Sequence, residues 1–180
     1  MKEAFLKVYE VLKEMSKDPD LLCAQFWLKI KKLHDQYDEE AVWKLMFDNM
    51  TWLINTKVLT SKFLLQNFTI EELSSHNIYF QDKVIIKDAK AVLFGTAKAE
   101  VSGHSLITQF ENSETECYDT TFVTLFGNSK TIVRDCIAEG FNNSKITGKG
   151  YAKIEAWENA QVISTDSDFV VLQEGAKKLK

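Results

Sequence analysis

The residues best suited to catalysis or metal binding in this chain include three histidines, His34, His76 and His104. None of them is spaced from a carboxylate or a cysteine as in a metal site or a catalytic triad. A lone imidazole needs such partners before it can do acid–base or ligand chemistry. The sequence therefore predicts a non-catalytic protein without a metal or cofactor. An enzyme site around His76, Asp82 and His104 remains the alternative from a different class.

The three cysteines, Cys23, Cys117 and Cys136, form no CxxC pair and are odd in number. This usage is typical of reduced thiols, so we expect a cytoplasmic protein. Nothing near Cys117 or Cys136 in the sequence would lower a thiol pKa, and we expect both to act as small hydrophobic residues.

Acidic residues gather at expected turns without the glycine–aspartate nonapeptide pattern that binds calcium. We expect them to be ordinary solvated residues: Asp119, Asp135, Glu158, Asp166 and Asp168.

Charge and composition exclude several classes of partner. The chain has 180 residues, 22 basic and 26 acidic, and a net charge of −4. Arg134 is the only arginine, so bidentate contacts to phosphate or guanine have almost no donors, and the composition argues against nucleic-acid binding. No apolar run approaches the roughly 20 residues of a membrane helix. The remaining partners are another protein or a second copy of the chain.

Residues 1–75 have the period of amphipathic helices. Phe5, Val8 and Leu12 share one face of a first helix. Asp18-Pro19 has the form of an N-cap followed by proline and predicts the start of a second helix. The negative charge of Asp38-Glu39-Glu40 predicts the start of a third, which we expect to continue through Trp52 and Leu53. Thr69 and the two glutamates after it predict a short last helix.

After about residue 81 the helical period ends and an eight-residue repeat begins. Cut from Ala89, the chain gives eleven units, from AKAVLFGT to DFVVLQEG, with one residue missing from the sixth, SKTIVRD. Positions one, three and five are mostly small or apolar, positions two and four mostly polar, and positions seven and eight are turn formers. This alternation predicts a strand of about five residues and a tight corner in each unit, with two walls packed close together.

A second period is superimposed on the first. Large aromatic residues occupy position six of every other unit, and the same units carry apolar residues at outward position two. The coil is therefore expected to contain sixteen residues, with one apolar and one charged face. We take the apolar residues as a candidate partner-binding or interdomain face: Phe94, Leu106, Phe110, Phe122, Phe126, Ile137, Phe141, Trp157 and Phe169.

Three interpretations of this face remain open. The rings could fill the inside of one corner while the chain's own helices cover the face. Part of the face could instead stay open for a partner. The rings could also form a platform on which sugars stack.

The octads AKIEAWEN (Ala152–Asn159), AKAEVSGH (Ala97–His104) and TFVTLFGN (Thr121–Asn128) resemble the octapeptide repeats, with units like ATVEAWGN, of uncharacterised β-solenoid proteins from bacteria and phages. The resemblance covers about half of the chain. It implies a β-solenoid fold and carries no single activity.

Together these patterns predict an α+β protein. We expect an N-terminal helical domain over residues 1–80, a flattened parallel β-solenoid over 81–176 with two strands per coil, and a charged tail over 177–180. By elimination, we expect a non-catalytic binding or assembly module that presents a rigid surface to a macromolecular partner. The alternative is a phage or mobile-element inhibitor that binds a host enzyme or defence complex.

Overall fold

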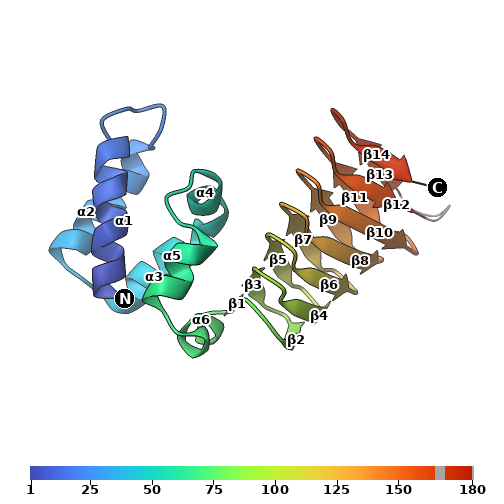
Figure 1. Ribbon diagram of the computed structural model, residues 1–180, viewed down its shortest axis with the longest axis horizontal. Helices are drawn as coiled ribbons and strands as arrows, with labels where there is room; N and C mark the ends of the chain where they lie inside the picture. Colours follow the sequence, from blue (N-terminus) through green and yellow to red (C-terminus); the bar gives the residue numbers. More distant parts are fainter. Residues whose placement is uncertain (165–168, 180) are drawn as a thin grey trace. The chain divides into compact units, whose positions relative to one another are not determined.

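The computed structural model describes residues 1–164 and 169–179 (Figure 1). Asp166, Asp168 and Lys180 lie outside these residues. The chain divides into two compact units, Met1–Thr69 and Ile70–Lys180. This boundary lies earlier than the expected one at residue 80, because the last helix and the first strand belong to the second unit. Among the described residues, no helix combines the length and apolar character needed to span a membrane.

The first unit consists of helices around a small apolar core. Phe5, Leu12, Ile30 and Leu53 are almost fully buried in it. The helical period predicted this burial for Phe5 and Leu12. The helices of this unit are α1 (Lys2–Met15), α2 (Ala24–Asp35), α3 (Glu39–Asp48), α4 (Met50–Asn55) and α5 (Ser61–Asn67).

Two helix boundaries differ from the expectation. Helix α2 begins after Cys23, whereas Asp18 accepts a hydrogen bond from the N–H of Asp20 at 2.9 Å and forms a local turn. The third helix starts as predicted, with Asp38 capping the N–H of Ala41 at 2.8 Å, but it ends before Asn49, and α4 carries Trp52. An Asp side chain can accept a backbone N–H either as a helix N-cap or within a local turn. The sequence alone therefore did not decide which of the two Asp18 forms.

The second unit starts with α6 (Ile70–Ser75), which contacts β1, and continues as a parallel β-solenoid (Figure 1). Its strands alternate between two seven-stranded sheets within the described residues. The first sheet, called sheet A, contains β1 (Ile78–Tyr79), β3 (Lys90–Leu93), β5 (Leu106–Gln109), β7 (Phe122–Leu125), β9 (Ile137–Gly140), β11 (Lys153–Ala156) and β13 (Phe169–Leu172). Sheet B contains β2 (Lys83–Lys87), β4 (Lys98–Ser102), β6 (Glu114–Cys117), β8 (Lys130–Arg134), β10 (Lys145–Lys149), β12 (Gln161–Ile163) and β14 (Lys177–Leu179).

The strand register confirms the sixteen-residue coil. Leu106 pairs with Phe122, and Lys98 pairs with Glu114. Across the shortened unit SKTIVRD the offset falls to fifteen, because Lys130 pairs with Lys145. The missing residue therefore shortens one corner and does not shift the inward and outward faces.

The solenoid extends further than the repeat cut from Ala89. Strands β1 and β2 precede that residue, and β2 lies in a second seven-residue unit, DKVIIKD (82–88). The prediction of a separate charged tail after residue 176 is wrong. Lys177–Leu179 form strand β14, which pairs with Gln161–Ile163. Backbone pairing with the coil below is open to any sequence, so a run of lysines joins the sheet when the register places it there.

Small side chains fill the space between the two sheets, as the inward columns predicted. Ala138, Ala152, Ala156 and Ala160 are completely buried. A Cβ on Gly140 would come within 2.8 Å of the Ser144 hydroxyl and 2.9 Å of the Ile146 side chain. The two walls are therefore too close for a larger residue at this point.

A buried polar cluster interrupts this apolar core. The hydroxyl of Thr115 donates to Oε1 of Gln109 at 3.0 Å and lies 2.7 Å from the hydroxyl of Thr131. The amide of Gln109 donates to the carbonyl of Lys130 at 3.2 Å. Because each of these buried polar groups has a partner, the cluster joins the two sheets without the cost of unpaired groups.

Candidate interaction surface

The outward face of sheet A carries a column of apolar side chains at position two. In successive coils Leu106, Phe122 and Ile137 pair directly in register. Leu106 is 53% exposed and Ile137 is 42% exposed, with Phe122 half-buried between them. Lys90 and Lys153 flank this group in the same column. The result is a short apolar strip bounded by lysines.

A second column on the same sheet is made of stacked rings. Six aromatic side chains follow one another with centroid separations of 4.9, 5.0, 5.2, 5.0 and 4.8 Å and interplanar angles of at most 14°. Phe110 and Phe126 are vertical neighbours, which confirms the predicted register. We call the six residues the ring column: Phe80, Phe94, Phe110, Phe126, Phe141 and Trp157.

The ring column lies outside the packed cluster of inward side chains. That cluster includes the preceding residues Leu93, Leu125 and Ala156 but none of the rings, although Phe94 and Phe110 are themselves buried. Strand alternation places position six on the same side as positions two and four. The rings therefore stack beside this cluster and not within it.

Stacking also determines what the rings can offer a partner. Each internal ring has a neighbour about one coil spacing away on both faces, so its edge is what remains for contact. Stacking of a sugar on an aromatic residue requires an open ring face, and the column does not provide one between its ends. Phe126, Phe141 and Trp157 are half-buried and form an apolar ridge beside the strip at position two.

A ladder of corner residues holds the ridge in place. The residues after the last five rings, from Phe94 to Trp157, have positive φ: Gly95, Glu111, Gly127, Asn142 and Glu158. The carboxylate of Glu111 accepts from the N–H of Gly95 at 2.7 Å, and that of Glu158 accepts from the N–H of Asn142 at 2.7 Å. At the corners occupied by Glu111, Asn142 and Glu158, the side chain thus accepts a hydrogen bond from a backbone N–H of the preceding coil. Turn-forming residues were expected there, but this link between coils was not visible in the sequence.

Sheet B presents the charged face that the repeat predicted. At outward position two Lys83, Lys98, Glu114, Lys130 and Lys145 follow one another in register. Position four adds Glu100 and Glu116, and position six adds Lys87, Arg134 and Lys149.

Glu114 is the centre of the ion pairs on this face. Its carboxylate lies 2.8 Å from the ammonium of Lys98 and 3.5 Å from that of Lys130. The hydrogen bond from Lys98 is the main reason why the pKa of Glu114 falls below its usual value, and Lys130 lowers this pKa further. A groove of about 530 Å³ runs over these residues. The charged column lines one side of the groove, and Ile132 and Thr147 are among the residues that line the other.

The sequence missed this groove because the repeat was cut from Ala89 and left Lys83 out of the column. The signal was present, because DKVIIKD (82–88) has the same length and final aspartate as SKTIVRD (129–135).

The histidines are placed in three different settings. His34 stacks on Tyr9 with a centroid separation of 4.0 Å, and His104 lies 2.6 Å from the hydroxyl of Thr120 through Nδ1. His76 follows α6 directly. Within residues 1–164 and 169–179, no group of three or more His, Cys, Asp or Glu side chains could hold a metal ion.

The cysteines divide into one exposed and two buried thiols. Burial raises the pKa of the Cys136 thiol to about 11 and also raises that of Cys117. Cys23 is exposed at the start of α2, where the backbone N–H groups of Phe26 and Gln25 lower its thiol pKa. All three are free.

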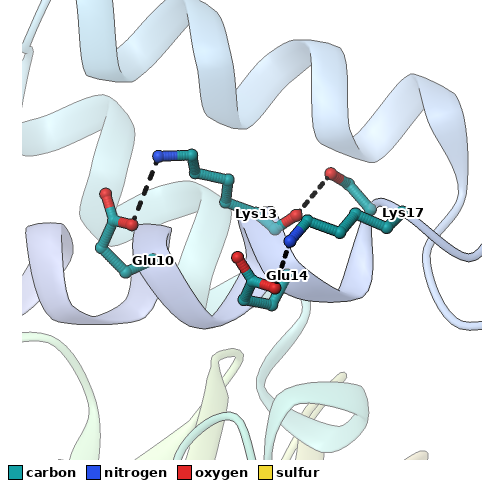
Figure 2. Close-up of polar contacts among 5 residues, drawn as sticks. Glu10, Lys13, Glu14 and Lys17 are labelled. Carbon is teal, nitrogen blue, oxygen red and sulfur yellow. Dashed lines mark hydrogen bonds and ion pairs between the residues drawn. The ribbon is translucent and has the colours of Figure 1, made fainter.

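The exposed side of α1 carries charged side chains beside two apolar ones, Leu6 and Val11, which are 41% and 45% exposed. Figure 2 shows Lys13 paired with Glu10, and Lys17, just after the helix, paired with Glu14. The hydrogen bond from Lys17 lowers the pKa of Glu14. Exposed pairs three residues apart contribute little to binding or stability.

The fold defines the class of the protein as a parallel β-solenoid preceded by helices. The chain matches no protein-family model, no curated protein and no solved structure.

Proposed function

We propose that the chain is a non-catalytic binding or assembly module, whose solenoid presents a rigid surface to another protein or to a second copy. The observation that carries this proposal is the exposed apolar strip of Leu106, Phe122 and Ile137. Contiguous exposed apolar patches with a polar rim mark sites of interaction.

The surroundings of the strip support the same function. The half-buried rings of Phe126 and Phe141 extend the apolar area, and Lys153 with Glu155 gives it a polar edge. An apolar centre with a polar rim is the usual composition of a protein interface. Continuous strand pairing beneath the strip fixes the spacing of its side chains before a partner arrives, which reduces the entropy lost on binding.

We also propose kinship with the octapeptide-repeat solenoids of bacteria and phages, on the strength of the sixteen-residue coil and of units such as AKIEAWEN. The three free thiols support a location in the reducing cytoplasm.

Phe122→Glu tests the proposed binding function, with Lys153→Glu in the same column as its control. A charge buried in an apolar contact without a partner costs several kcal/mol, so Phe122→Glu should abolish the association while the monomer stays folded. Light scattering reports self-association, and affinity capture compared between the two variants reports a different partner. The proposal fails if Phe122→Glu changes neither the mass in solution nor the set of captured proteins. Loss of activity in a captured enzyme on binding would identify the module as an inhibitor.

A further inference from the structure

The outward face of sheet B differs in charge from the rest of the chain. Strands β2 to β10 of this sheet contribute seven basic and three acidic outward side chains, a surplus of four positive charges, whereas the whole chain carries −4. A local field of opposite sign to the net charge favours an anionic partner at this face over the others.

The order of the charges along the groove says more about the partner than the net charge of the face does. Along the column the signs are positive, positive, negative, positive and positive, from Lys83 to Lys145, with Glu114 in the middle. Successive coils are about 4.8 Å apart, so the midpoint between the first two lysines lies about 7 Å from Glu114, and so does the midpoint between the last two.

This spacing matches an extended polypeptide. Alternate side chains of a strand project to the same side about 6.7 Å apart. A segment with acidic, any, basic, any and acidic residues, lying along the solenoid axis, would place each carboxylate between two lysines and its cation against Glu114. Glu116, Ile132 and Thr147 line the opposite side of the groove, facing the residues between the charges.

The ion pairs within the groove do not prevent the binding of such a peptide, whose charges would replace them. The pairs of Glu114 with Lys98 and Lys130, and of Lys83 with Glu100 at 3.8 Å, join side chains that are 38–70% exposed. Surface pairs of this kind are individually weak. Lys145 forms no ion pair among the described residues and is available to a partner.

A nucleic acid fits the same groove poorly. Its backbone carries a negative charge at every residue, and the three glutamates of sheet B would repel it at the centre of the face.

We therefore propose that the sheet B groove binds an extended peptide segment with the acidic–any–basic–any–acidic pattern. This surface is distinct from the apolar strip, and the proposal does not depend on the function proposed above.

The probe is a fluorescein-labelled nonapeptide, Gly-Ser-Glu-Thr-Lys-Thr-Glu-Ser-Gly, titrated with the full-length protein at low ionic strength and followed by anisotropy. A charge-inverted peptide, Gly-Ser-Lys-Thr-Glu-Thr-Lys-Ser-Gly, is the matched control. We expect the first peptide to bind at least tenfold tighter than the second, with an affinity that falls as salt is added.

Variants of the protein locate the contact. Lys130→Glu combined with Lys145→Glu should weaken binding at least tenfold, and a peptide whose second glutamate is replaced by lysine should bind this double variant better than the original peptide does. Lys153→Glu on sheet A and Phe122→Glu should leave peptide binding unchanged, which separates this test from that of the apolar strip. Circular dichroism checks that each variant is folded.

Three results would overturn the inference: equal affinity for the two peptides, tighter binding of single-stranded oligothymidine than of the first peptide, or no binding at millimolar protein.

Discussion

The carboxylate of Asp135 accepts a hydrogen bond from the backbone N–H of Tyr151, one coil further on, at 2.8 Å. The same contact occurs between Asp88 and the N–H of His104 at 2.9 Å. Both aspartates end a seven-residue unit, and both have positive φ. Where the corner lacks its eighth residue, the aspartate therefore ties the shortened corner to the corner of the next coil.

This arrangement requires glycine at the neighbouring corner. Gly150 has φ of +71°, and a Cβ there would lie 2.3 Å from Oδ1 of Asp135. We expect Gly150→Ala to lower the free energy of unfolding by about 1–2 kcal/mol from the positive φ alone, and by more because of the clash. In an Asp135→Gly background the same substitution should cost about 1 kcal/mol less, because the clashing carboxylate is gone. Urea denaturation of the four proteins measures this coupling, and strictly additive effects would contradict it.

The ring column should contribute to stability in proportion to burial. Phe110 is 4% exposed and stacks on both Phe94 and Phe126. We expect Phe110→Ala to destabilise the protein by about 3–5 kcal/mol, the usual range for a buried phenylalanine. Phe122→Ala removes the same atoms from the outward strip and should cost about 1 kcal/mol or less in the isolated monomer. Similar losses for the two variants in thermal or urea unfolding would show that the column is not a packed element.

The inward columns can be tested with adjacent residues. Ala152 is completely buried between the sheets, and Lys153 is exposed on sheet A. Ala152→Trp should destabilise the solenoid by at least about 1–3 kcal/mol, because an indole cannot fit between walls this close. Lys153→Trp should change stability by about 0.5 kcal/mol or less. If Ala152→Trp melts like the parent protein, position one does not face inward.

Thiol labelling should separate the three cysteines. In the native protein Cys23 should react rapidly, because it is exposed and its pKa is lowered, whereas Cys117 and Cys136 should be protected. In denaturant without reductant all three should react. Ellman's reagent followed by mass spectrometry measures both states. A missing pair of thiols after denaturation would indicate a disulfide and would contradict the prediction of reduced cysteines.

The buried Cys136 thiol should make stability depend on alkaline pH. Its folded pKa is about 11, above the ordinary value of 9.0. The unfolded thiol loses its proton first as pH rises, so the unfolded state binds fewer protons between about pH 9 and 11 and stability falls across this range. Cys136→Ala should reduce the slope of stability against pH there, as measured by urea midpoints. An unchanged slope would mean that burial does not hold this proton.

The sequence by itself determined the repeat architecture, because alternation along a strand is a local property. Small residues such as Ala152 at position one and turn formers at positions seven and eight required two close walls joined by tight corners. The recurrence of rings in every second unit required a sixteen-residue coil, since two strands separate Phe110 from Phe126. In the helical unit the period predicted α1, and the acidic run from Asp38 predicted the start of α3.

Contacts between residues far apart in the chain were decided only by the tertiary structure. Whether Asp18 caps a helix or closes a turn depends on which backbone groups the packed helices leave unpaired. The hydrogen bond from the N–H of Gly95 to Glu111, the ion pairs of Glu114 and the stacking of the rings beside the inward cluster arise from coils stacked in one register. A repeat pattern gives the faces of each strand, but each contact across coils also depends on the shortened corners, which change the offset between neighbours from sixteen to fifteen.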